Sequence, residues 1–61
     1  MISLTRPNGS PIVLNGDLIE TIEANGETIV TLTTGNVVVV RDSPQEIAEK
    51  VTAFKRAIYA R

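Results

Sequence analysis

Four pairs of asparagine and glycine divide the first forty residues into five short apolar segments, and this spacing limits the available folds more than any other feature. Asparagine and glycine fit the positive φ angles of two-residue hairpin turns, so each pair is expected to join two antiparallel strands. The pairs are Asn8-Gly9, Asn15-Gly16, Asn25-Gly26 and Gly35-Asn36. We therefore predict a five-stranded antiparallel meander.

The apolar segments have the composition of strands. Residues 2–6 alternate apolar and polar side chains, which is typical of a half-buried strand. The third segment also suits one turn of helix with Asp17 as its cap, but its β-branched side chains favour a strand. The predicted strands cover residues 2–6, 11–14, 18–23, 28–33 and 37–40.

The last predicted strand is a run of four valines, Val37–Val40. It places apolar methyl groups on both faces of the sheet, so both faces should be covered. One face can pack against a helix, whereas the other needs a second sheet or a second subunit. The run therefore predicts a homo-oligomer.

A C-terminal amphipathic helix is predicted over about residues 44–60. Ser43 and Glu46 match a capping box, and Pro44 suits the first helical position. Glu46 is also expected to pair with Lys50 one turn later. A narrow apolar stripe at helical spacing should pack on the sheet. Its members are Ile47, Val51, Phe54 and Ile58. The predicted fold class is β-rich α+β, a meander followed by one helix.

Size and composition exclude several kinds of protein. We expect the 61 residues to form one domain, residues 1–61. A domain of this size buries little surface and usually needs extra stabilisation from a disulfide, a metal or a partner subunit. The chain has no cysteine and no histidine, so disulfides and ordinary zinc sites are excluded and self-association remains. No cofactor is expected. A formal net charge of −1 argues against a nucleic-acid surface.

Catalytic groups are scarce. Without histidine or cysteine, acid–base catalysis would fall to carboxylates, lysines or Tyr59. Glu20 and Glu23 lie three residues apart in a predicted strand and so point to opposite faces, which does not suit a carboxylate pair. We predict no enzymatic activity.

No membrane-spanning segment is expected. The longest apolar run, Val37–Val40, is far shorter than the ~20 residues of a membrane helix. Met1 leads directly into a strand pattern without a basic leader. A cytoplasmic protein without direct membrane insertion is therefore expected.

Four cationic residues are candidates for partner binding. Arg6 and Arg41 each end an apolar strand, where a guanidinium group suits a phosphate or carboxylate. Lys55 and Arg56 belong to a basic C-terminal segment without acidic residues. The alternatives are ordinary ones: solvation, a salt bridge from an arginine to Asp42 or a glutamate, and interaction of the basic end with the helix dipole.

An ordered set of short motifs extends over nearly the whole chain. It comprises Leu4-Thr5-Arg6, Asn8-Gly9, Leu14-Asn15, Ile19-Glu20, Ile22-Glu23, Gly35, Val40 and Ser43. By this set the chain resembles the FlbD/SwrD family. Three departures are visible: Pro7 replaces a larger apolar residue, Asn25-Gly26-Glu27 replaces a Pro-Asp turn, and the tail is short.

The resemblance implies a small, cytoplasmic, non-enzymatic protein that supports flagellar motor torque and swarming. It also implies a flagellar stator or motor protein as the partner and a location at the periphery of the motor. It supplies no catalytic residues. On this basis the basic helix end, or a sheet edge of an oligomer, is expected to contact a cytoplasmic segment of the stator.

A second resemblance leads to a different class of function. The length, the Leu4-Thr5-Arg6 start, the meander and the final helix are also similar to the CsrA translational regulators, which are RNA-binding dimers. By that resemblance an RNA site would be lined by Leu4, Arg6, Val40 and Arg41. The histidine of that family is absent here, and the net charge is less favourable to RNA. Motor accessory protein is the preferred interpretation.

Overall fold

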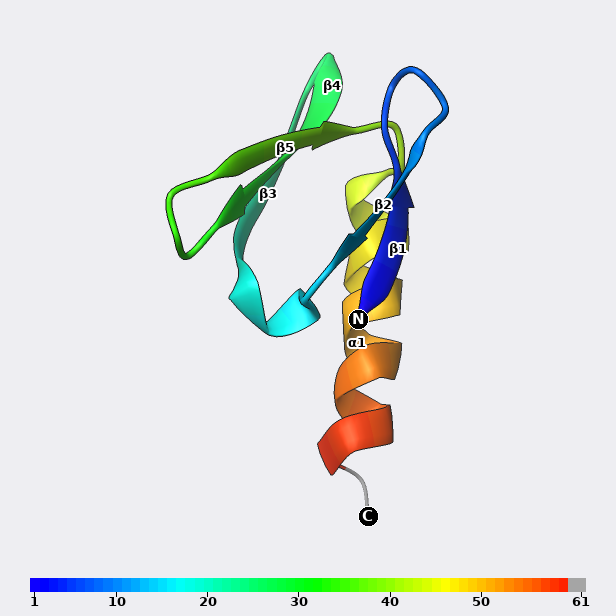
Figure 1. The fold of residues 1–61 in the computed structure, drawn as a ribbon, viewed down its shortest axis with the longest axis vertical. Helices are drawn as coiled ribbons and strands as arrows, with labels where there is room; N and C mark the ends of the chain where they lie inside the picture. Colours follow the sequence, from blue (N-terminus) through cyan, green and yellow to red (C-terminus); the bar gives the residue numbers. More distant parts are fainter. Residues whose placement is uncertain (60–61) are drawn as a thin grey trace.

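The computed structural model describes residues 1–59 and contains five strands, a short 3₁₀ turn and one helix (Figure 1). The elements are β1 (Ile2–Thr5), β2 (Pro11–Leu14), η1 (Gly16–Leu18), β3 (Ile19–Asn25), β4 (Glu27–Leu32), β5 (Val37–Val40) and α1 (Pro44–Tyr59). The β-rich α+β class, the antiparallel strands and the C-terminal helix are confirmed. Residue 60, the predicted end of the helix, lies outside the described residues.

The five strands form two sheets rather than one continuous meander. β1 pairs with β2, and β3, β4 and β5 form a second antiparallel sheet in that order. The break falls at Asn15-Gly16, which was expected to be a hairpin turn. Instead, the side chain of Asn15 accepts a hydrogen bond from Asp17 N at 3.0 Å and caps η1, so that β2 and β3 diverge.

The β1–β2 and β4–β5 turns share one geometry, and it differs from the expected two-residue turn. In the first turn Gly9 N–H donates to Arg6 O at 2.9 Å, and Arg6 N–H donates to Ser10 O at 2.8 Å. The second turn repeats both bonds around Gly35. Both glycines have a φ of 92°, as in a three-residue loop that ends in a glycine bulge. Within residues 1–59 only glycines have a positive φ, so no asparagine supplies it.

The core lies between the two sheets and the helix. Its buried side chains come from β1, β2, β4, β5 and α1: Ile2, Leu4, Leu14, Val30, Val40 and Ile47. Thr28, Val30, Val38 and Val40 share the inner face of their sheet, because side chains alternate along a strand and these residues pair across it. Each sheet therefore contributes one apolar face to a common interior.

The apolar stripe of α1 is buried at its start and exposed at its end. Ile47 is fully buried, Val51 and Phe54 are partly buried against the core, and Ile58 is 40% exposed. The helix extends beyond both sheets in Figure 1, which explains this gradient. Phe54 packs over η1, where a Cβ on Gly16 would lie 3.0 Å from the Cδ2 atom of the ring.

The valine run is covered on one face only in this chain. Val40 is 1% exposed, whereas Val37 is 59% exposed. Ile29 and Val39 pair across β4 and β5 and lie on the outer face, away from the core, where they are half-buried. The predicted second cover for this face, another subunit, stays a prediction.

Candidate functional site

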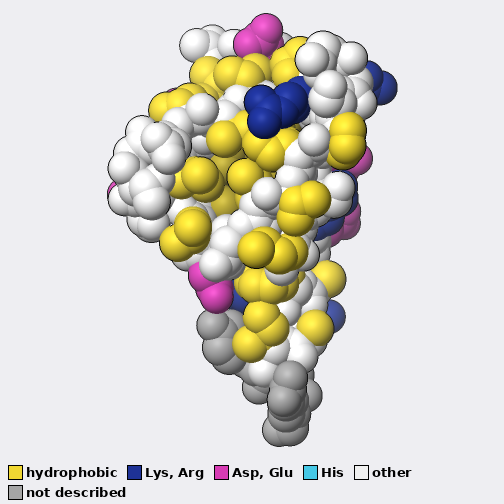
Figure 2. Space-filling view, viewed as in Figure 1, with side chains coloured by type: hydrophobic (Ala, Val, Ile, Leu, Met, Phe, Trp, Pro, Cys, Tyr) yellow, Lys and Arg dark blue, Asp and Glu magenta, His cyan; other side chains and the backbone are white. Residues whose placement is uncertain are grey.

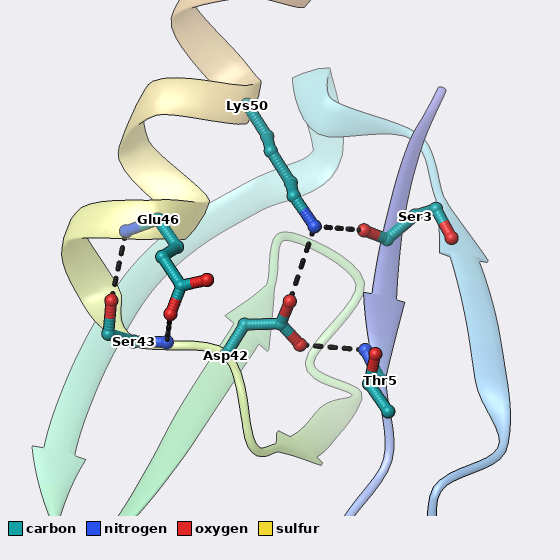
Figure 3. A network of polar contacts seen from close by, with 6 residues as sticks. All are labelled: Ser3, Thr5, Asp42, Ser43, Glu46 and Lys50. Carbon is teal, nitrogen blue, oxygen red and sulfur yellow. Dashed lines mark hydrogen bonds and ion pairs between the residues drawn. The ribbon is translucent and has the colours of Figure 1, made fainter.

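Asp42 connects the first strand to the helix. Its carboxylate is buried, and Oδ1 accepts a hydrogen bond from Thr5 N at 2.7 Å (Figure 3). Oδ2 lies 3.2 Å from the Nζ atom of Lys50, which also donates to Ser3 O at 2.8 Å. In addition, Arg41 N–H donates to Thr5 O at 2.8 Å. Arg41, Asp42 and Lys50 therefore provide hydrogen-bond partners for the outer edge of β1.

The environment of Asp42 favours its ionised form. Burial alone raises the pKa of a carboxyl group, but the hydrogen bond from Thr5 N–H and the bond and charge of Lys50 outweigh it. The pKa of Asp42 is consequently held below its ordinary value of 3.8. Asp42 therefore has a structural role: both of its carboxylate oxygens have partners, Thr5 N–H and Lys50, at the junction between β1 and the helix.

This junction differs from two pairings that the sequence suggested. Lys50 binds Asp42 and Ser3, and Glu46 instead accepts a hydrogen bond from Ser43 N at 3.0 Å. Ser43 Oγ in turn accepts from Glu46 N at 3.1 Å, so the predicted capping box is present (Figure 3). The predicted ion pair between Glu46 and Lys50 does not form among residues 1–59, because each side chain has a nearer partner. Asp42 likewise pairs with a lysine and not with an arginine.

Arg6 and Arg41 lie near the tip of the β1–β2 hairpin. Arg6 begins the hairpin turn, and a guanidinium nitrogen of Arg41 lies 3.9 Å from the place that a Cβ on Gly9 would take. Both side chains are exposed, and neither has a hydrogen bond or ion pair to another described side chain. They line two different grooves, with Pro7 belonging to both.

The groove beside Arg6, here called the β5 groove, has a volume of about 400 Å³. It lies between β5 and the first hairpin, and Arg6 is the charged residue among its lining. Its walls are Arg6, Pro7, Asn8, Ile12, Val37, Val38 and Val39. Figure 2 shows apolar side chains gathered over this face between the three-stranded sheet and the hairpin, with a cationic side chain near its upper rim.

The groove beside Arg41 is smaller, about 230 Å³, and is built from the β3–β4 turn. Glu27 lines it together with Arg41, so its charge is mixed. Of these two grooves, the β5 groove is the one that combines a mostly apolar wall with a cation and no acidic lining residue.

Lys55 and Arg56 are not part of the hairpin end. Both are exposed on the second half of α1, and Figure 1 places this part of the helix at the opposite end of the molecule from the β1–β2 turn. The four predicted partner-binding residues thus form two separate groups. The apolar wall of the β5 groove was missed as a site, although the valine run had indicated an uncovered surface.

Two kinds of feature are absent from residues 1–59. No group of three or more acidic, histidine or cysteine side chains is placed to hold a metal ion. No helix there has the length and hydropathy needed to cross a bilayer.

Fold and surface together define a small β-rich module with an apolar groove and exposed cations, a class suited to binding other macromolecules. Residues 1–59 match the family model described as FlbD, flagellar and swarming motility proteins. The chain belongs to this family, as the sequence motifs predicted. No curated protein and no solved structure matches the chain.

Proposed function

We propose that this protein is a non-enzymatic accessory of the flagellar motor that supports swarming through protein–protein contacts. The observation that carries the proposal is the family match over residues 1–59. The apolar β5 groove and the unpaired arginines agree with it, since both suit the binding of another chain. A role in flagellar and swarming motility belongs to the family; the contact mechanism is our proposal.

The partner in this proposal is a cytoplasmic segment of the torque-generating stator. A small accessory with no membrane helix among its described residues would reach the motor by binding a component that is already there. The two cationic groups offer separate contacts for such a segment. The RNA-binding alternative gains no support from the structure, because Leu4 and Val40 are each 1% exposed and cannot contact RNA in this fold.

The test is a deletion strain in a flagellated bacterium that encodes this chain. We expect normal numbers of flagella, weaker torque on tethered cells and reduced swarming, all restored by the intact gene. Purified protein should bind a purified stator cytoplasmic segment saturably. Unchanged torque and swarming after deletion would contradict the proposed function.

A further inference from the structure

The edge strand β5 is less protected than the other strand edges of the molecule. Exposed edges in natural proteins are usually blocked by proline, by charge or by cover from another element. β1 is covered by its bonds to Asp42 and Lys50, β2 begins with Pro11, and β3 carries the exposed Glu20 and Glu23. β5 consists of four valines and has no such protection.

The backbone of β5 has free positions on the side away from β4. Leu32 N–H donates to Asn36 O, and hydrogen-bonded positions in an antiparallel ladder recur at every second residue. Val38 and Val40 therefore continue the ladder to β4, whereas the N–H and C=O groups of Val37 and Val39 point away from it. β5 is the terminal strand of its sheet, so the described residues provide these groups with no ladder partner.

The open edge is already used for pairing just beyond the C-terminal end of β5. Arg41 follows Val39 by two residues and shares its orientation, and its N–H donates to Thr5 O at 2.8 Å. β1 then turns away at Arg6 into the hairpin. The β5 groove, with Val37 and Val39 among its lining residues, continues from this point and is left open.

The lining of the β5 groove specifies the chemistry of an occupant. Ile12 and Val38 offer apolar contacts, and Arg6 has an exposed guanidinium with no acidic neighbour among the lining residues. A carboxylate is the natural partner of such a group, through charge-assisted hydrogen bonds. A volume of about 400 Å³ suits a few residues of extended chain rather than a folded domain.

We propose that the β5 groove binds an extended segment of a partner protein, which adds as a strand to Val37–Val39 and places a carboxylate on Arg6. Main-chain hydrogen bonds to the edge supply affinity, and the apolar lining and Arg6 supply selectivity. The proposal deepens the proposed function, since it states where and in what conformation the partner protein binds.

The probes are three short synthetic peptides of alternating valine and threonine that differ at one central position: glutamate, glutamine or lysine. Binding is followed by NMR of the isotope-labelled full chain. We expect the glutamate peptide to bind about tenfold more tightly than the lysine peptide, which corresponds to about 1.4 kcal/mol. The amide signals of Val37 and Val39 should shift and their hydrogen exchange should slow.

Substitutions distinguish the contribution of the β5 edge to peptide binding from that of the Arg6 charge. Val37→Pro removes one edge N–H at the first position of the strand, where proline is tolerated, and should weaken binding about fivefold relative to Val37→Ala. Arg6→Gln should abolish the preference for glutamate and retain binding. Glu49→Gln, at an exposed charged position of α1 that does not line the β5 groove, serves as the control and should leave peptide binding unchanged.

Several outcomes would overturn this proposal. They are equal affinity for the three peptides, shifts confined to α1, an unaffected Val37→Pro variant, and displacement of the peptides by a GGA-containing RNA hairpin. Swarming tests the proposed function separately. If a deletion strain has a swarming defect but the protein binds none of the peptides, the proposed binding site in the β5 groove is wrong and the proposed motility function stands.

Discussion

At the scale of single residues, Asp42 contributes more through its backbone contact than through its ion pair. The hydrogen bond that Asp42 accepts from Thr5 N–H is partly buried and ends on a carboxylate that is only 8% exposed, whereas the side chain of Lys50 is 42% exposed. A buried donor left without an acceptor costs about 1–3 kcal/mol, but an ion pair open to solvent contributes about 0–1 kcal/mol. Loss of Asp42 should therefore be the more damaging change.

We predict that Asp42→Ala lowers the free energy of unfolding by about 1–3 kcal/mol and Lys50→Gln by less than about 1 kcal/mol. Urea titrations followed by circular dichroism measure both. The control is Glu49→Ala, at an exposed acidic position next to Lys50 on α1, and it should hardly change the free energy of unfolding. A larger loss for Lys50→Gln would show that the contacts of Lys50 with Asp42 and with Ser3 O stabilise the fold more than the bond between Asp42 and Thr5 N–H.

The pH dependence of stability follows from the same carboxylate. The pKa of Asp42 is lower in the folded chain than its ordinary value of 3.8, so the unfolded state binds more protons between these two values. The contribution of the charge is therefore complete above pH 3.8 and is lost as the pH falls through the folded pKa. The stability difference between the parent chain and Asp42→Asn should accordingly shrink in this acid range, as measured by thermal unfolding across a pH series.

At the scale of elements, the contact of η1 with α1 depends on the absence of a side chain at Gly16. A Cβ there would lie 3.0 Å from one Phe54 ring carbon and 3.4 Å from another, so the ring or the turn must shift. Overpacking of this kind costs about 1–3 kcal/mol. Gly16→Ala should destabilise the chain by about that amount, as measured by denaturant unfolding.

A double-mutant cycle provides the control. Phe54→Leu removes the ring, so Gly16→Ala should cost clearly less in that background than in the parent chain. Equal costs in the two backgrounds would mean that the ring is not the source of the strain.

The elements were more predictable than their association. Local signals determine the capping box of Ser43 and Glu46 and the period of the strands, and each was found in the structure. The partition into two sheets was missed because Asn15 can either enter a hairpin or cap a 3₁₀ turn, and the sequence does not distinguish these uses. The partner of Lys50 was missed because Ser3 lies 47 residues away in the chain.

The candidate site was predictable in the same partial way. Exposed arginines at strand ends could be found from the sequence, but their assignment to separate grooves depends on how the hairpin tip folds toward β5. From the valine run we predicted only that both faces of the strand should be covered. Which of its faces is open follows from tertiary packing.

At the scale of the whole molecule, the outer face of β3–β4–β5 is the surface that we propose for self-association. Ile29, Val37 and Val39 lie there with their apolar side chains outside the core. A chain of 61 residues has a small hydrophobic core, so burying this apolar face against another chain would add stability. We propose a homo-oligomer with this face at its interface.

We predict that light scattering finds a mass of two or more chains and that Ile29→Glu reduces it to one. A buried, unpaired carboxylate is costly at an apolar interface, which is the reason for the effect. Val13→Glu, at a 61% exposed apolar position on β2, is the matched control and should leave the mass unchanged. A monomeric parent chain at high concentration would exclude this interface.

The junction at Asp42 also sets the order in which the protein can mature. Thr5 and Ser3 are held by residues 37 and 47 positions later, so the hairpin of β1 and β2 lacks these two contacts until the start of the helix has been synthesised. Forming contacts between residues so far apart in the chain costs loop-closure entropy before the contacts contribute any stability, so this step of folding is slow. During translation the N-terminal hairpin must therefore wait for these contacts until the start of the helix has left the ribosome.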